Sequence, residues 1–140
     1  MKEYLQRYFP GLNDEQIEKL VEMEKIYSGW NKLINVISRK DFENFNINHV
    51  LHSLSIAKVF KFEKGEAILD LGTGGGFPGI PLAILFPESK FVLLDSIAKK
   101  IKVVNEVVNQ LAIKNVVAVN ARAEQHNGQY NFVVTRAVAV

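Results

Sequence analysis

Two acidic side chains and a group of glycines are the residues of this chain best suited to binding a small molecule. Asp70 is followed by Leu-Gly-Thr-Gly-Gly-Gly over 71–76, and Asp95 lies 23 positions after Gly72. Glycines allow a tight turn and let a ligand approach the backbone closely. A carboxylate about 20 residues after such a turn is typical of one that hydrogen-bonds ribose hydroxyls. The spacing therefore predicts a site for an adenosine-containing ligand.

Three ligands compete for this turn. A phosphate-binding P-loop needs Lys and then Ser or Thr after its last glycine, whereas Ile and Pro follow Gly79. A dinucleotide turn can be aligned with the later glycines, but Pro78 has no N–H to offer a pyrophosphate. S-adenosylmethionine carries no phosphate, and an acid such as Asp70 before the first glycine suits its ammonium group. The residues favour this third ligand and leave an NAD-type oxidoreductase domain as the alternative.

The segments around the turn alternate between apolar strands and helices. Strands are expected over 66–71, 90–95, 115–121 and 130–137, with helices over 80–86 and 96–112. The second helix is expected to start at Ser96 as its N-cap and to bury Ile97. Continuous apolar strands joined by helices predict an α/β fold with a parallel sheet covered on both faces. Ligands of such sheets bind outside the carboxyl ends of the strands, where the glycine turn is expected.

The first part of the chain is predicted to be helical. Residues 12–38 place apolar side chains at helical spacing, Asn13 and Gln16 resemble a capping box, and Gly29 is expected to interrupt the helix. The expected buried stripe consists of Ile17, Leu20, Val21, Tyr27, Trp30 and Leu33. A second amphipathic helix is expected over 49–60. We therefore divide the chain into a helical cap, residues 1–64, and a Rossmann-like core, residues 65–140.

Composition narrows the possible functions. The chain has 140 residues, 48% of them hydrophobic, a net charge of +2 and no Cys. The absence of Cys excludes disulfides, thiolate zinc sites and a Cys nucleophile, and fits a reducing cytoplasm. No apolar run approaches the roughly 20 residues that span a bilayer, and the three His residues do not have the spacing of a tetrahedral metal site. We expect a cytoplasmic monomer with no metal and no membrane contact.

The chain resembles a known family along most of its length. The segments GWNKLINVIS, with Trp30, Asn31 and Asn35, HVLHSLSIA, LDLGTGGGFPGIPLAI, LLDSIAKKIKVV, NARAEQ and VVTRAVA are similar to those of the bacterial small-subunit (16S) ribosomal RNA guanine-N7 methyltransferases, the glucose-inhibited division protein B family. The resemblance covers about residues 15–140. It implies a class I S-adenosylmethionine-dependent methyltransferase fold that transfers a methyl group to N7 of a guanine in the 16S RNA of the small ribosomal subunit.

The resemblance also implies residue roles. The cofactor would lie across the ends of the first three strands, with the glycine turn on its methionine part, Asp95 on the ribose, and Ala123 and Glu124 beside the adenine. Arg136 would lie near the cofactor or the target base, as a candidate for positioning. The implied cofactor contacts are Asp70, Gly72, Gly74, Gly76, Phe77, Asp95, Ala123, Glu124 and Arg136. Candidates for RNA contact are Arg39, His49, Lys99 and Lys100.

Length is the main departure from the family pattern. Proteins of the family continue past the fourth strand with further strands and helices, so this chain resembles a form truncated at the C-terminus with an incomplete sheet. The fourth strand is then expected at an edge, where an apolar run invites pairing or aggregation. A non-catalytic RNA-binding or assembly fragment of the same fold is therefore a further alternative.

Overall fold

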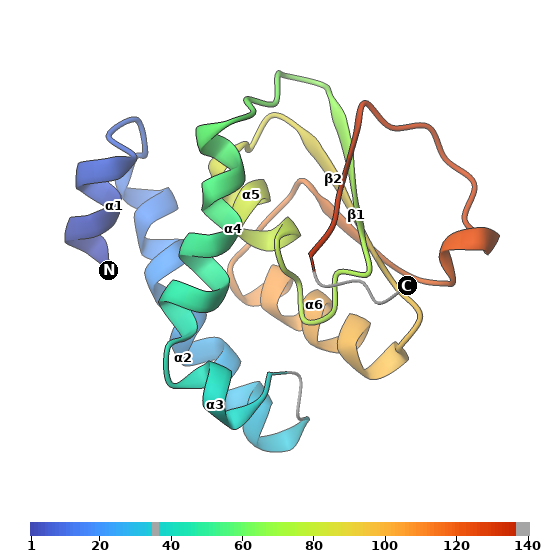
Figure 1. Ribbon diagram of the computed structural model, residues 1–140, viewed down its shortest axis with the longest axis horizontal. Coiled ribbons are helices and arrows are strands. Elements are labelled where there is room, and N and C mark those ends of the chain that lie inside the picture. Colours follow the sequence, from blue (N-terminus) through green and yellow to red (C-terminus); the bar gives the residue numbers. More distant parts are fainter. Residues whose placement is uncertain (35–36, 137–140) are drawn as a thin grey trace.

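The computed structural model describes residues 1–34 and 37–136. A helical layer comes first in the chain and a parallel sheet with its helices follows, as Figure 1 shows. The helical layer contains α1 (Lys2–Tyr8), α2 (Asp14–Leu33), α3 (Arg39–Phe42), a π-helical turn η1 (Asn46–Leu51), α4 (His52–Leu54) and a 3-10 turn η2 (Ser55–Lys58). No helix among the described residues has the length and apolar character needed to cross a bilayer.

The sheet contains β1 (Ala67–Leu71), β2 (Lys90–Asp95), β3 (Val116–Asn120) and β4 (Phe132–Val134). All neighbouring strands are parallel and their order is β3-β2-β1-β4. The chain therefore builds outward from β1 to β3 and then returns to place β4 on the other side of β1. This reversal of strand order lies beside the carboxyl end of β1, which is where ligands bind in open α/β sheets. The predicted parallel α/β fold is confirmed.

One face of the sheet is packed against α5 (Gly79–Leu85) and α6 (Ala98–Gln110), and Ile68 and Phe91 on this face are buried. The other face carries a row formed by Leu69, Val92, Val117 and Val133, which are paired in register. Of these, Val117 is 61% exposed and Val133 is 59% exposed. Both lie on edge strands. The prediction that both faces are covered is therefore wrong for β3 and β4.

Helix α2 begins as the sequence predicts. The Asn13 side chain accepts a hydrogen bond from the Gln16 N–H at 2.8 Å, and the Gln16 side chain accepts one from the Asn13 N–H at 2.9 Å. The helix then continues through Gly29, so the expected break is wrong. Val21 and Leu33 are exposed because they lie outside the buried face, which is centred on Leu20 and Tyr27. The buried stripe is narrower than the sequence suggested.

The second helical segment runs from Asn46 to Lys58 and consists of a π-helical, an α-helical and a 3-10 turn in succession. It buries Val50 and Leu54 completely. A helix over most of 49–60 was predicted correctly, although it begins earlier. Both α2 and α4 pack on α5, and α2 also contacts α6. The helical layer therefore packs against the helices that follow β1 and β2. This packing places it next to the glycine turn, which leads into α5.

Helix α6 begins later than predicted. Its N-cap is Ile97 and not Ser96, and no side chain caps it. The Ile97 N–H instead donates to Asp95 Oδ1 at 2.9 Å, and the Ile97 side chain is exposed. The prediction is wrong for both residues, because Ser96 lies outside the helix and the Asp95 carboxylate holds the backbone of Ile97 just before it. The remaining apolar positions of the helix are buried as expected.

Candidate functional site

Asp70 closes the turn that follows β1. Its side chain is fully buried, and Oδ2 accepts hydrogen bonds from the Thr73 hydroxyl at 2.7 Å and from the Gly79 N–H at 2.8 Å. Gly79 is the first residue of α5, so the carboxyl group also binds one of the N–H groups that a helix start leaves without an internal acceptor. This inward placement joins strand, turn and helix. Contact of Asp70 with a cofactor ammonium group stays a prediction.

Burial changes the acidity of this carboxyl group. It raises the pKa of Asp70 from 3.8 to about 7, and the nearby Asp95 charge acts in the same direction. The hydrogen bonds from Thr73 and Gly79 and the positive charge of Arg136 lower this pKa but do not cancel the burial. Among the described residues, Asp70 Oδ1 has no hydrogen-bond partner. Near neutral pH the group is therefore divided between its acid and ionised forms.

Glycine is required in this turn by the backbone conformation and, at one position, also by a lack of space for a side chain. Gly72, Gly74 and Gly76 adopt positive φ angles of 70°, 60° and 116°, which L side chains rarely adopt. A Cβ on Gly76 would also lie 2.5 Å from Ile80 Cδ1, whereas a Cβ on Gly74 would meet nothing within 4 Å. Gly76 is therefore enclosed by the core, and Gly74 borders the open space that a ligand can enter.

Several N–H groups of the turn are already bonded within the protein. The Gly74 N–H donates to Asp95 Oδ2 at 2.8 Å, and the N–H groups of Gly76 and Phe77 both donate to the Thr73 carbonyl at 3.0 Å. Gly79 donates to Asp70, and proline at 78 has no N–H. A pyrophosphate binds through such donors. The N–H groups of Gly74, Gly76, Phe77 and Gly79 are therefore not available to a pyrophosphate.

A cavity of about 220 Å³ lies at the carboxyl ends of β1 and β2, bordered by the 3-10 turn η3 (Ala123–Gln125). Four predicted cofactor residues line it: Gly72, Asp95, Ala123 and Glu124. They come from three separate segments of the chain, and Gly74 joins them through its hydrogen bond to Asp95. The fold thus gathers at one cavity the strand ends that the sequence analysis singled out.

Asp95 is half-buried at the edge of this cavity and is held in a fixed orientation. Its Oδ2 accepts from Gly74 and its Oδ1 accepts from Ile97. A carboxylate offers about four lone-pair positions, so each oxygen retains capacity to accept a hydroxyl group. A pair of adjacent hydroxyls, such as a ribose diol, matches this arrangement.

Arg136 lies in a different cluster. Its guanidinium donates to the Asn48 carbonyl at 2.9 Å and to His49 Nδ1 at 2.7 Å, and it stands over the Phe77 ring at 5.5 Å. His49 and Phe77 are both buried, with ring centroids 5.1 Å apart. These three residues connect the end of β4, the helical layer and the glycine turn. They do not line the cavity, so their predicted contacts with cofactor or RNA stay predictions.

The other predicted RNA contacts lie on the surface. Arg39 is exposed in α3, and Lys99 and the less exposed Lys100 lie in the first turn of α6, shortly after Asp95. In the family segment near the end of α2, the Asn31 side chain clamps the backbone of Ile37 with two hydrogen bonds of 2.9 Å. Trp30 is partly buried against the core, as expected, and Asn35 lies outside the described residues.

Sequence reasoning missed two residues that shape the turn. The Thr73 hydroxyl binds Asp70, as described above, and the Tyr27 hydroxyl donates to the Gly75 carbonyl at 2.5 Å. Tyr27 was placed on the buried stripe of a helix, which is correct. No local pattern could reveal that its hydroxyl reaches a turn 48 residues further along the chain.

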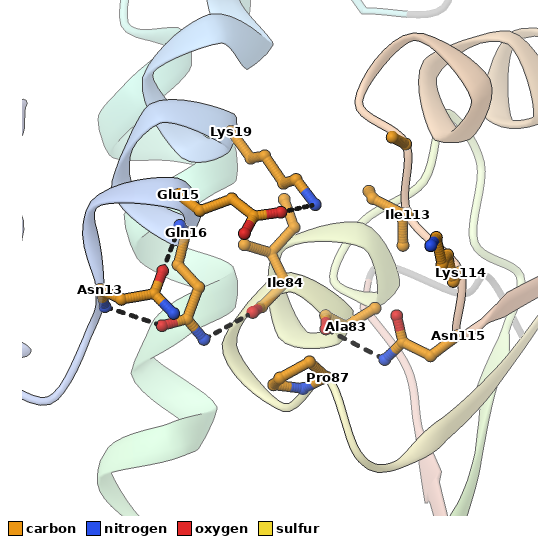
Figure 2. Close-up of a pocket in the computed structure, with 11 residues that line it drawn as sticks. Asn13, Glu15, Gln16, Lys19, Ala83, Ile84, Pro87, Ile113, Lys114 and Asn115 are labelled. Carbon is orange, nitrogen blue, oxygen red and sulfur yellow. Dashed lines mark hydrogen bonds and ion pairs between the residues drawn. The ribbon is translucent and has the colours of Figure 1, made fainter.

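A larger cavity of about 340 Å³ lies at the opposite edge of the sheet, shown in Figure 2. It is bordered by Pro87 and Asn115, which precede β2 and β3. Its polar side chains bind neighbouring backbone: Gln16 donates to the Ile84 carbonyl at 3.0 Å, and Asn115 donates to the Ala83 carbonyl at 3.1 Å. The bond from Gln16 joins the helical layer to the core, and the bond from Asn115 joins two segments of the core. Within the described residues, no group of three or more potential metal ligands occurs at either edge.

Comparison with known proteins identifies the family. The model of the GidB family, described as rRNA small subunit methyltransferase G, matches residues 16–140. The chain belongs to this family. The family resemblance predicted from the sequence is thereby confirmed, and the match includes the glycine turn, Asp95 and the 3-10 turn at Ala123–Gln125.

Individual relatives also support membership of this family. The chain is 57% identical over 138 residues to ribosomal RNA small subunit methyltransferase G of Christiangramia forsetii, covering 99% of this chain and 65% of that protein. It is 59% identical over 132 residues to the protein of the same name from Flavobacterium johnsoniae, covering 94% and 63%. The chain thus spans about two thirds of the length of these curated relatives.

Solved structures support the fold. A SAM-dependent methyltransferase from Aquifex aeolicus superposes with a TM-score of 0.51 at 24% identity, covering 59% of this chain and 46% of that one. Together with the four parallel strands, this likeness confirms an incomplete class I methyltransferase fold.

Proposed function

We propose that this chain binds S-adenosylmethionine at the carboxyl edge of its sheet and belongs to an enzyme that methylates N7 of a guanine in 16S ribosomal RNA. The observation that carries the proposal is that the Asp95 carboxylate lies at an open cavity, beside a turn in which the N–H groups of Gly74, Gly76 and Phe77 are already bonded within the protein. Such a site suits a ligand with a ribose but no phosphate. Membership of the GidB family supports the reaction and the RNA substrate.

The residues present fit this cofactor. Asp95 would accept the ribose hydroxyls, Gly72 and Gly74 would lie against the methionine part, and Ala123 and Glu124 would border the adenine. When bound, S-adenosylmethionine supplies an electrophilic methyl group, which the N7 lone pair attacks as the carbon–sulfur bond breaks and its electrons return to sulfur. Because N7 carries no proton, the protein needs no general base.

The protein's contribution is then mainly geometric. Holding the methyl group and the attacking nitrogen in line supplies about 7–11 kcal/mol in well-oriented reactions. Arg136, fixed between His49 and Phe77, would support the side of the site that receives the base. Lys99, Lys100 and Arg39 would meet RNA phosphates. The remaining predictions are part of this proposal: a cytoplasmic monomer acting on the small ribosomal subunit, built from residues 1–64 and 65–140.

Two measurements test the proposal in sequence. Calorimetric titration of the chain with S-adenosylhomocysteine and, separately, with NADH identifies the ligand; we expect heat of binding only with the first. Binding of NADH alone would instead support the oxidoreductase alternative. The second measurement is transfer of radiolabelled methyl groups to small-subunit particles that lack the modification, where incorporation at a guanine N7 is expected.

A second candidate function is RNA binding without catalysis. It is favoured by the exposed side chains of Val117 and Val133, which leave one face of β3 and β4 without the covering layer of a complete α/β sheet. Cofactor binding and RNA binding without methyl incorporation would support this candidate over the first.

A further inference from the structure

We propose that Tyr27 is a positioning residue of the cofactor site, whose hydroxyl holds the Gly75 carbonyl and thereby fixes the glycine turn. The proposal rests on the function proposed above. Tyr27 belongs to α2 of the helical layer and is fully buried. Its hydroxyl donates to the Gly75 carbonyl at 2.5 Å. The helical layer would thus act directly on the conformation of the turn that borders the cofactor cavity.

The hydroxyl of Tyr27 contacts the turn at two successive residues. Besides the bond to Gly75, the same oxygen lies 2.8 Å from the place where a Cβ on Gly76 would stand. The hydroxyl therefore holds the Gly75 carbonyl and fills the space beside Gly76 that a side chain there would need. Burial raises the pKa of this hydroxyl above its ordinary value, so it remains a protonated donor across the working pH range.

The sequence of the turn makes its backbone flexible unless other residues hold it. Residues 74–76 are three consecutive glycines, and glycine has the greatest backbone freedom of any residue. Gly74 is held from one side by its N–H bond to Asp95, and Gly76 is held by its N–H bond to the Thr73 carbonyl. The peptide that joins Gly75 to Gly76 is held at both of its polar groups, by the bond from its N–H to Thr73 and by the Tyr27 hydroxyl on its carbonyl. Without the Tyr27 hydroxyl, this peptide would keep only its bond to Thr73, and the looser turn would weaken the hold of Gly74 on Asp95.

The ring of Tyr27 is held independently of its hydroxyl. Its centroid lies 5.1 Å from that of Phe77 and 5.4 Å from that of Phe45. Replacing Tyr27 with Phe therefore keeps the aromatic packing and removes only the hydrogen bond. This makes Tyr27→Phe a clean variant, and it should remain folded.

The test compares the unaltered chain, Tyr27→Phe and the control Tyr4→Phe, whose hydroxyl lies on a partly exposed ring of α1. Each is titrated with S-adenosylhomocysteine, and amide hydrogen exchange is followed by NMR at Gly76, Phe77 and the strands β1 and β2. We expect Tyr27→Phe to bind about 5- to 10-fold more weakly, the effect of one buried hydrogen bond. Exchange at Gly76 and Phe77 should accelerate while the strands remain protected, and Tyr4→Phe should match the unaltered chain.

Other outcomes would overturn the inference. Binding by Tyr27→Phe within about twofold of the unaltered chain, with unchanged exchange in the turn, would show that the hydroxyl fixes nothing. Equal loss of protection in the turn and in the strands would show a general loss of stability and no positioning role. If the unaltered chain binds no S-adenosylhomocysteine, the proposed function fails by itself, and the exchange data alone decide whether Tyr27 anchors the turn.

Discussion

Replacing Asp70 with Asn should change how the stability of the protein depends on pH. The pKa of Asp70 is about 7 in the folded protein and 3.8 ordinarily. Between these values the unfolded chain has released the proton that the folded chain keeps, so raising the pH removes stability. The loss begins near pH 4 and is complete above about pH 7. The neutral amide of the Asp70→Asn variant has no such dependence, because it does not titrate.

The size of the effect follows from the shift. Three pKa units at 1.36 kcal/mol each correspond to a total of about 4 kcal/mol, of which roughly 2 to 3 kcal/mol is lost between pH 5 and pH 8. The assay is urea unfolding of both proteins at these two pH values. The difference in unfolding free energy between the proteins is compared, because this cancels the titration of every other group. When the pH is raised from 5 to 8, the unfolding free energy of Asp70→Asn should increase by roughly 2 to 3 kcal/mol relative to that of the unaltered chain.

One result would refute this reasoning about Asp70. If the difference between the proteins stays constant within about 0.5 kcal/mol between pH 5 and pH 8, the carboxyl group is ionised in the folded protein over this whole range. The hydrogen bonds from Thr73 and Gly79 and the charge of Arg136 would then outweigh the effect of burial.

Three further predictions test the turn, the ribose contact and the open face. Gly76→Ala should destabilise the protein by about 2 kcal/mol or more in urea unfolding, because the new Cβ clashes with Ile80 and the residue has a positive φ angle. Gly74→Ala should destabilise it by only about 1 kcal/mol, because only the positive φ angle opposes the new side chain. Equal losses of stability would contradict the packing described for Gly76. Asp95→Ala should weaken binding of S-adenosylhomocysteine roughly 10- to 100-fold in calorimetry, the effect of losing hydrogen bonds to a charged group, and unchanged affinity would remove this residue from the site. Val133→Lys should reduce aggregation at high protein concentration, followed by light scattering, because charge on an edge strand opposes pairing; equal aggregation of both proteins would show that this face is not involved.

The sequence predicted those parts of the fold that depend on local patterns. The capping box at Asn13, the strands, and the gathering of Gly72, Asp95, Ala123 and Glu124 at one edge all follow from short-range signals and from the geometry of parallel strands. The failures have structural causes. Gly29 stays helical because its neighbours Tyr27 and Trp30 both pack on the core. Ser96 is not the N-cap because α6 begins only after Ile97, whose N–H bonds to Asp95.

The sequence could not predict contacts between distant segments. The bond from Tyr27 to Gly75 and the cluster of Arg136, His49 and Phe77 join residues that are far apart in the chain, and their residue types have ordinary roles elsewhere. The inward orientation of Asp70 was also hidden, because an acid at the end of a strand can face either the ligand or the helix that follows. The hydrogen bond from Gly79, the first residue of α5, shows which orientation the fold selects.

The most direct test of the account is an NMR titration of the isotopically labelled chain with S-adenosylhomocysteine. If the carboxyl edge of the sheet binds a phosphate-free adenosyl ligand, the backbone amide signals of Gly72, Gly74, Asp95 and Glu124 will shift together and saturate. The signals of Asn13 and Asn115, at the cavity of the opposite edge, will stay in place. Shifts confined to that opposite cavity, or no shift at the glycine turn at saturating ligand, would contradict the account.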